Sequence, residues 1–401
     1  MYLSRVITLA FFTITLFFTS PSLLIASYGA TSNEIGAECS LQQRRDLNSP
    51  HNSFRVEEKN SARDDSFKVL IAPIEFIDLR QTDEFAKKLE KTKESVAQFY
   101  SKMTKQGLNL EWKTLDQAIL LSASVESYDS GSRAKMQNAV PIVIEAQRIL
   151  ATESPINEFD FIVLATPPTT LKHHISTSIS VLQHGEYIDS TILSGDFWES
   201  GGRWEILAHE LGHGLGLLDL YSAGVFDPKT HSDSGFFSQF EHMGPYDLMN
   251  SPTGSGPELT AWNRFMLGYL QAEEIACIPK GILNMKLEAI QKDFGVRALF
   301  IKLDETRMII VENRQRIGFD RGLSKNSVGL IVYEVNLSVK SGFGPLKLLS
   351  RSRDSSGYRY AISTGQSIEY AGFKISSVSQ HGSKLLVEIR KLTLKSNSNK
   401  S

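Results

Sequence analysis

Cysteine, excess charge and long apolar runs are all scarce in this chain of 401 residues. Two cysteines leave room for one disulfide, and no apolar run beyond the first 30 residues is long enough to span a bilayer. The 43 basic and 45 acidic residues give a net charge of −2, so there is no excess positive charge to neutralise phosphates. Nucleic acid is therefore not expected as a partner.

The overall composition is that of an ordinary globular protein. Hydrophobic residues make up 41% and charged residues 22% of the chain, which excludes collagen-like, coiled-coil and wholly disordered proteins. A chain of this length is expected to contain two or three structural units, at roughly 150 residues each.

Residues 1–30 are typical of a signal peptide for export. Arg5 precedes an uncharged apolar run, and small residues follow near Ala26 and Ala30. We therefore predict a secreted, extracellular protein. The alternatives are a periplasmic location and an uncleaved amino-terminal membrane anchor, because the apolar character continues through Ile25.

The two cysteines, Cys39 and Cys277, would form a disulfide in an oxidising compartment. Two free thiols are the simplest alternative. A third is that Cys39 belongs to a prosegment and occupies a metal site as an inhibitory ligand.

Changes in sequence pattern divide the chain into segments. Residues 31–65 are polar and lack apolar periodicity, which predicts a linker or a short prosegment. Residues 66–277 alternate strand-like and helical runs, which predicts a mixed α/β domain. Residues 278–392 alternate apolar and polar positions between turn residues, which predicts an all-β, sandwich-like domain that binds a ligand or braces the rest. Residues 393–401 are expected to be a disordered tail.

The segment with the clearest chemistry is the HExxH pattern that begins at His209. On a helix, four residues turn through about 400°, so His209 and His213 project from one face and can bind one zinc ion. Glu210 lies beside them and is the candidate general base. The alternative is an amphipathic core helix with two incidental histidines.

Three glycines, Gly212, Gly214 and Gly216, follow within and after this helix. Each costs a helix up to ~1 kcal/mol relative to alanine, and packing alone gives no reason to expect them. A positive φ at Gly216 would end the helix and turn the chain back, so that Asp219 becomes the third ligand. If Asp219 is not the ligand, Glu241 and His231 in the following loop are the next candidates.

A second feature lies about thirty residues further along, where Gly244 and Pro245 indicate a turn. Met249 follows that turn, and its thioether is predicted to pack beneath the histidines. A core methionine unrelated to the metal is the alternative.

Together, HELGHGLGLLDLY at 209–221, GPYDLMNS at 244–251 and ELTAWNRFMLGY at 258–269 resemble the immune inhibitor A family of secreted bacterial metallopeptidases. The similarity covers roughly residues 66–390. It implies an α+β fold with a zincin, metzincin-like catalytic domain at 66–277, followed by the carboxy-terminal β domain. One zinc ion would then be held by an HExxHxxGxxD site above a Met-turn. Tyr246 is a departure, because a tryptophan is expected there.

The resemblance implies His209, His213 and Asp219 as zinc ligands, Glu210 as the general base and Met249 as the Met-turn residue. Tyr246, His242 and His231 are further candidates for contacts with the oxyanion or substrate, each weighed against a surface role. A structural calcium ion is also considered, although no EF-hand spacing is present. Its candidate ligands are Asp227, Asp233, Glu241 and Asp247.

The function expected from these residues is that of a secreted zinc endopeptidase acting on protein or peptide substrates. One alternative is a zinc hydrolase of the same fold that acts on a glycopeptide or another narrow surface target. The other is a zinc-containing binding protein without turnover, although binding alone does not require Glu210.

The export signal gives the first prediction. Protein recovered from culture medium should begin between Ser27 and Ser32, or near Asp65 if a prosegment is also removed. Amino-terminal sequencing measures this directly. Recovery of the full-length chain in the membrane fraction would instead establish the uncleaved anchor.

Overall fold

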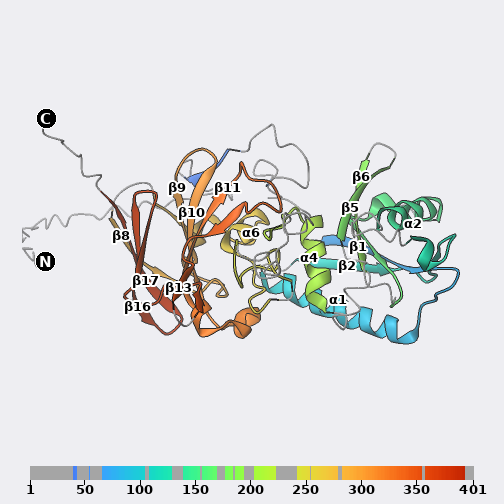
Figure 1. Cartoon of the computed structure of the whole chain (residues 1–401), viewed down its shortest axis with the longest axis horizontal. Coiled ribbons are helices and arrows are strands. Elements are labelled where there is room, and N and C mark those ends of the chain that lie inside the picture. The colour runs from blue at the N-terminus through green and yellow to red at the C-terminus, as the bar shows by residue number, and fades with distance from the viewer. Residues whose placement is uncertain are drawn as a thin grey trace, which may run out of the picture. The chain divides into compact units, whose positions relative to one another are not determined.

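The structure is a computed structural model, and Figure 1 shows the arrangement of its elements. It describes residues 39–42, 54, 66–103, 108–128, 139–153, 156–168, 177–183, 186–193, 203–222, 242–252, 254–278, 282–354 and 357–392. The expected signal peptide and the carboxy-terminal tail lie outside these ranges. Within them, no helix has the length and apolar character needed to cross a membrane.

The amino-terminal half is built on a mixed six-stranded sheet. Its strands are β1 (Ser66–Glu75), β2 (Asn109–Thr114), β3 (Ile119–Leu120), β4 (Phe161–Ala165), β5 (Thr177–Gln183) and β6 (Glu186–Leu193). Their order is β2-β1-β4-β6-β5, and β3 pairs with the far end of β1. All pairs are parallel except β5 with β6, which makes β5 an antiparallel edge strand.

Helices cover both faces of this sheet, as the alternation of side chains along β1 requires. Phe67, Val69 and Ile71 share a core with α1 (Asp83–Met103) and α4 (Trp204–Gly214). Leu70, Ala72 and Ile74 point to the other face and share a core with α2 (Ala139–Glu153). The inner face of α4 therefore packs against the sheet.

The carboxy-terminal part is rich in β-structure. A five-stranded sheet has the order β12 (Leu346–Leu348), β11 (Gly329–Asn336), β10 (Arg307–Arg314), β9 (Ala298–Lys302) and β7 (Ile275–Cys277). A four-stranded sheet has the order β15 (Ser367–Tyr370), β16 (Phe373–His381), β17 (Lys384–Lys391) and β8 (Ile282–Leu287). Side chains of both sheets, among them Ile309 and Val387, form one core between them.

Shorter elements complete the described chain. They are α6 (Ala261–Met266), the hairpin of β13 (Ser352–Asp354) with β14 (Gly357–Arg359), and the 3-10 helices η3 (Val125–Tyr128), η5 (Ile156–Glu158), η7 (Ala272–Glu274), η8 (Gly318–Gly322) and η9 (Lys325–Ser327).

The domain boundary expected at residues 277/278 does not coincide with a break in packing. Strand β7 lies before that point, yet it pairs with β9 beyond it. The five-stranded sheet is also buried on its second face, where Phe300 and Tyr333 join the core that contains Trp262. Residues from Asn33 onward form one unit by their contacts.

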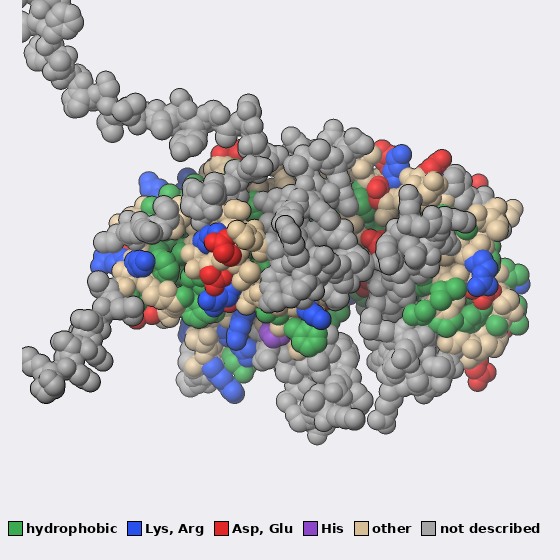
Figure 2. Space-filling view, turned by 90° about the horizontal axis from the view of Figure 1, so that it is seen from above, with side chains coloured by type: hydrophobic (Ala, Val, Ile, Leu, Met, Phe, Trp, Pro, Cys, Tyr) green, Lys and Arg blue, Asp and Glu red, His purple; other side chains and the backbone are tan. Residues whose placement is uncertain are grey.

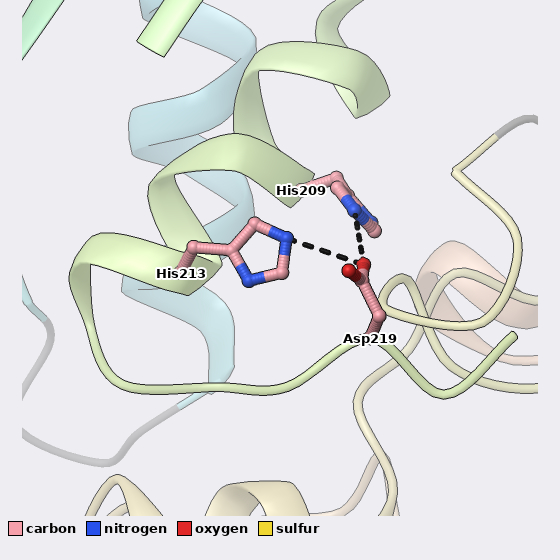
Figure 3. A group of neighbouring side chains, drawn as sticks. All are labelled: His209, His213 and Asp219. Atoms are coloured by element: carbon pink, nitrogen blue, oxygen red, sulfur yellow. Dashed lines mark ion pairs between the residues drawn. The ribbon is translucent and has the colours of Figure 1, made fainter. Parts of the chain in front are cut away.

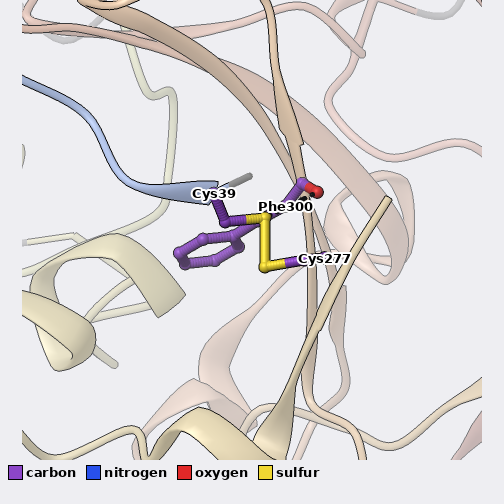
Figure 4. Close-up of a disulfide and its surroundings, with 3 residues drawn as sticks. All are labelled: Cys39, Cys277 and Phe300. Carbon is purple, nitrogen blue, oxygen red and sulfur yellow. Dashed lines mark hydrogen bonds between the residues drawn. A yellow bond between two sulfur atoms is a disulfide. The ribbon is translucent and has the colours of Figure 1, made fainter. Parts of the chain in front are cut away.

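Parts of the segment 31–65, which is predicted to be a linker or a short prosegment, lie among the described residues. Cys39, Leu41 and Phe54 are buried in the main core. The ring of Phe54 meets that of Trp262 edge-on, with centroids 5.6 Å apart. Cys39 forms a disulfide with Cys277, beside Phe300 (Figure 4).

This disulfide closes a loop of 238 residues, which gives the second prediction. Replacing both Cys39 and Cys277 by serine should lower the free energy of unfolding by about 2–4 kcal/mol, because the unfolded chain regains the freedom that the cross-link removes. Chemical denaturation with and without reductant measures the change. The account is contradicted if reductant leaves the unfolding of the parent protein unaltered.

Candidate metal centre

Helix α4 carries the HExxH pattern, and it is fixed by close contacts on its inner side. The Tyr100 hydroxyl on α1 donates a hydrogen bond to the Ala208 carbonyl over 2.6 Å. A Cβ atom at Gly212 would lie 2.6 Å from the sulfur of Met249, and one at Gly214 would lie 2.4 Å from the ring of Phe161. Packing therefore does account for these two glycines, contrary to the expectation from sequence.

Gly216 has a different role, because it reverses the chain. Its φ is +92°, as the sequence predicts, and nothing lies within 4 Å of the position where a Cβ would stand. The Leu217 N–H donates to the Gly212 carbonyl over 2.9 Å, and the Gly216 N–H donates to the His213 carbonyl over 2.8 Å. These two bonds form a Schellman motif, which ends α4 and turns the chain back towards its histidines.

The reversal brings a carboxylate to the two imidazoles (Figure 3). The Oδ1 atom of Asp219 lies 3.2 Å from Nε2 of His209 and 3.2 Å from Nε2 of His213. Among the described residues, this is the group of His, Cys, Asp and Glu whose potential ligand atoms converge, all within 4.8 Å of one another. The three expected ligands are thus brought together.

The orientation of both imidazoles is set by backbone carbonyls. Nδ1 of His209 lies 3.0 Å from the Leu248 carbonyl oxygen, and Nδ1 of His213 lies 2.9 Å from that of Leu217. With the proton on Nδ1 donated to these oxygens, each Nε2 keeps its lone pair for a ligand bond.

His213 and Asp219 favour each other's charged forms. Burial alone would lower the pKa of His213, but the Asp219 carboxylate outweighs it and raises this pKa to about 9. Burial alone would raise the pKa of Asp219, but the charge of His213 and the proximity of His209 hold it well below its usual range. Positive charge next to the Asp219 carboxylate is therefore favourable.

The turn that carries Met249 lies against α4. Met249 is fully buried, and its sulfur approaches the helix at Gly212. Asp247 has a positive φ of 72°, and its Oδ1 accepts the Met249 N–H over 2.9 Å. The other carboxylate oxygen accepts the Thr260 N–H over 2.7 Å, which ties the turn to the start of α6.

A buried ionic network supports this turn from the carboxy-terminal side. Arg314, at the end of β10, pairs with Asp320 at 2.7 Å and with Glu312 at 3.0 Å. Its guanidinium carbon lies 5.2 Å from the centre of the Tyr246 ring. Glu312 in turn accepts the Ala261 N–H at the first turn of α6.

Two further side chains adjoin the cluster. Glu210 is 5% exposed and follows His209 on α4. The ring of Tyr221 stacks on that of His209, with centroids 6.1 Å apart. Burial raises the pKa of Tyr221, and the nearby carboxylates of Asp219 and Glu210 raise it further. Sequence analysis missed Tyr221, although it stands only two residues after Asp219.

The structure describes three of the remaining candidates, Tyr246, His242 and Asp247. Tyr246 is fully buried and its hydroxyl donates to the Ser327 carbonyl, so it is not placed to contact substrate. The backbone carbonyl of His242 accepts the Leu348 N–H. Asp247, offered as a calcium ligand, uses both carboxylate oxygens to hold its own turn. The other candidates lie outside the described residues: His231, Asp227, Asp233 and Glu241.

Comparison with known proteins adds little to this geometry. No family model and no curated protein matches the chain. The solved structure of wild-type OgpA from Akkermansia muciniphila aligns with 70% of this chain and 90% of its own, at 12% sequence identity and a TM-score of 0.30. We base no argument on so low a TM-score. The resemblance to immune inhibitor A metallopeptidases therefore stays a prediction.

The chain reversal gives the third prediction. Gly216→Val should weaken zinc binding at least ~10-fold although the residue touches no ligand, because a β-branched residue strains a positive φ and displaces Asp219. Titration of metal-free protein with zinc measures the affinity.

Gly365 supplies a matched control, since its φ is +83° and its Cβ position is equally open. Gly365→Val should lower the stability of the protein about as much as Gly216→Val does, and its zinc affinity should equal that of the parent protein. Equal zinc affinity in the two variants would contradict the role given to Gly216.

Proposed function

We propose that this protein is a zinc-dependent endopeptidase. The observation that carries the proposal is the convergence of His209, His213 and Asp219, with their potential ligand atoms within 4.8 Å and Glu210 on the same helix. Two imidazoles and one carboxylate with an acid beside them are the groups needed for metal-assisted hydrolysis of a peptide bond.

The chemistry of these donors fits zinc. Zinc takes nitrogen and oxygen ligands and leaves a fourth position open in catalytic sites, whereas calcium prefers about six to eight oxygens. Asp219 Oδ1 is buried and directed between the two Nε2 atoms, and within the described part of the chain it has no hydrogen bond of good geometry. When bound, zinc would supply a Lewis acid that polarises the scissile carbonyl and lowers the pKa of water to about 7.

The residues of the chain have separate tasks in this proposal. Glu210 accepts the proton of the attacking water and then delivers it to the leaving amine. The carbonyls of Leu248 and Leu217 hold the imidazoles in one tautomer. The Tyr221 hydroxyl shares a hydrogen bond with the Asp219 carboxylate, which helps to hold that carboxylate in place.

The fold also offers a place for an extended peptide. Strand β5 is an edge of the six-stranded sheet and contacts α4. An edge strand presents backbone N–H and C=O groups that pair with an added strand. A polypeptide bound in this way would lie along the helix that carries Glu210.

Secretion belongs to the same proposal. Disulfides form and persist in oxidising compartments, so the bond between Cys39 and Cys277 supports export of the chain. The apolar pattern of residues 1–30 supports it independently.

The fourth prediction tests the general base. Glu210→Gln keeps the size of the side chain and removes the proton acceptor, so peptide hydrolysis should fall at least ~10²-fold. Hydrolysis of casein and zinc content per chain are the two measurements. Zinc content should stay at one ion per chain in the variant, as the proposal requires.

Glu205 provides the matched control on the same helix, where it pairs with Arg203 at 2.9 Å. Glu205→Gln should retain both activity and zinc. Near-parental proteolysis by Glu210→Gln would rule out the mechanism, and casein hydrolysis that survives a zinc chelator would rule out the role of the metal.

A further inference from the structure

We propose that a basic cavity between β12 and the hairpin of β13 with β14 binds acidic side chains of the polypeptide substrate, which makes acidic peptides the preferred substrates. This inference rests on the proposed peptidase function. The cavity has a volume of about 450 Å³, within the range of ligand pockets. Its lining includes Lys347, Arg351, Arg353, His242 and Tyr358, and none of the lining residues that the structure describes is acidic.

Two guanidinium groups of the cavity lie over the same aromatic ring. The guanidinium carbons of Arg351 and Arg353 lie 4.3 Å and 5.1 Å from the centre of the Tyr358 ring. The Arg353 guanidinium, which is exposed, presents N–H groups at its edge, and these match the two oxygens of a carboxylate. The arrangement therefore favours a carboxylate over a neutral side chain.

Lys347 adds a third positive charge to the cavity. Its cross-strand neighbour is Glu334, but that carboxylate accepts a hydrogen bond from the Tyr370 hydroxyl and is not part of the lining. Figure 2 shows Lys and Arg side chains gathered beside a histidine on one face of the molecule. Because the whole chain has a net charge of −2, this is a local concentration of positive charge.

Two segments connect the cavity to the metal centre. The first is the connection from β11 to β12, where Ser341 Oγ accepts the Asp219 N–H and the Gly342 N–H donates to the Asp219 carbonyl, both over 3.0 Å. This connection leads directly into β12, which carries Lys347.

The second segment begins at His242, whose carbonyl accepts the Leu348 N–H over 2.7 Å. It continues to Leu248, whose carbonyl contacts Nδ1 of His209. In this proposal, acidic residues on one side of the scissile bond occupy the cavity while the scissile bond lies at the candidate metal centre.

Binding to the Glu210→Gln protein tests the inference without turnover. The probes are two fluorescein-labelled peptides of equal length, one rich in glutamate and the other with glutamine in its place. The pocket variant is Lys347→Gln/Arg353→Gln, since both side chains are exposed. The control is Lys87→Gln/Lys91→Gln, which removes the same charge from the exposed face of α1.

In fluorescence anisotropy, the pocket variant should bind the acidic peptide at least ~5-fold more weakly, and the control should bind it as the parent does. The preference for the acidic peptide should also shrink as salt is added. Equal affinity for the two peptides, or equal loss in the pocket and control variants, would overturn the inference.

Cleavage of the same peptides by the parent protein separates this inference from the proposed function. If neither peptide is cleaved but acidic binding depends on Lys347 and Arg353, the peptidase proposal fails and the anion site stands. If both peptides are cleaved at equal rates, the peptidase proposal stands and the acidic preference fails.

Discussion

The reversal of the chain at Gly216 is the constraint on which the candidate metal centre depends. An α-helix can place two histidines on one face by itself, but a third ligand has to come from elsewhere. The Schellman motif after α4 returns the chain within a few residues, so Asp219 Oδ1 reaches both Nε2 atoms at 3.2 Å. The same turn supplies the Leu217 carbonyl that orients His213. This one local motif therefore fixes the position of Asp219 and the tautomer of His213.

The carboxy-terminal β-structure takes part in the site through buried charges. The Met249 turn provides the Leu248 carbonyl for His209, and Asp247 holds that turn to α6. Beneath it, Arg314 is paired on both sides by Glu312 and Asp320 and faces the Tyr246 ring. A buried charge that loses its partner is strongly destabilising, so β10 and the Met249 turn depend on each other. The β-rich part of the chain therefore supports the turn that carries Met249.

Local patterns predicted the parts of this structure that depend on local geometry. Helical spacing placed His209, Glu210 and His213 together on α4, and the positive φ at Gly216 followed from the need to turn the chain. Long-range contacts were not predictable from one sequence. Several features arise from contacts between different segments of the chain. They are the burial of Cys39 and Phe54, the close contacts that leave no room for a Cβ at Gly212 and Gly214, the burial of Tyr246 and the pairing of β7 with β9. Tyr221 was missed because no spacing rule marks it.

The central claim is that His209, His213 and Asp219 hold a single zinc ion. X-ray absorption spectroscopy of the zinc-loaded protein tests it most directly, because imidazole rings give a characteristic multiple-scattering pattern and carboxylate oxygens do not. The account predicts one zinc per chain with two imidazoles and otherwise oxygen ligands at about 2.0–2.2 Å. A third imidazole, a sulfur ligand or the same two-imidazole spectrum with unchanged affinity in Asp219→Ala would contradict it.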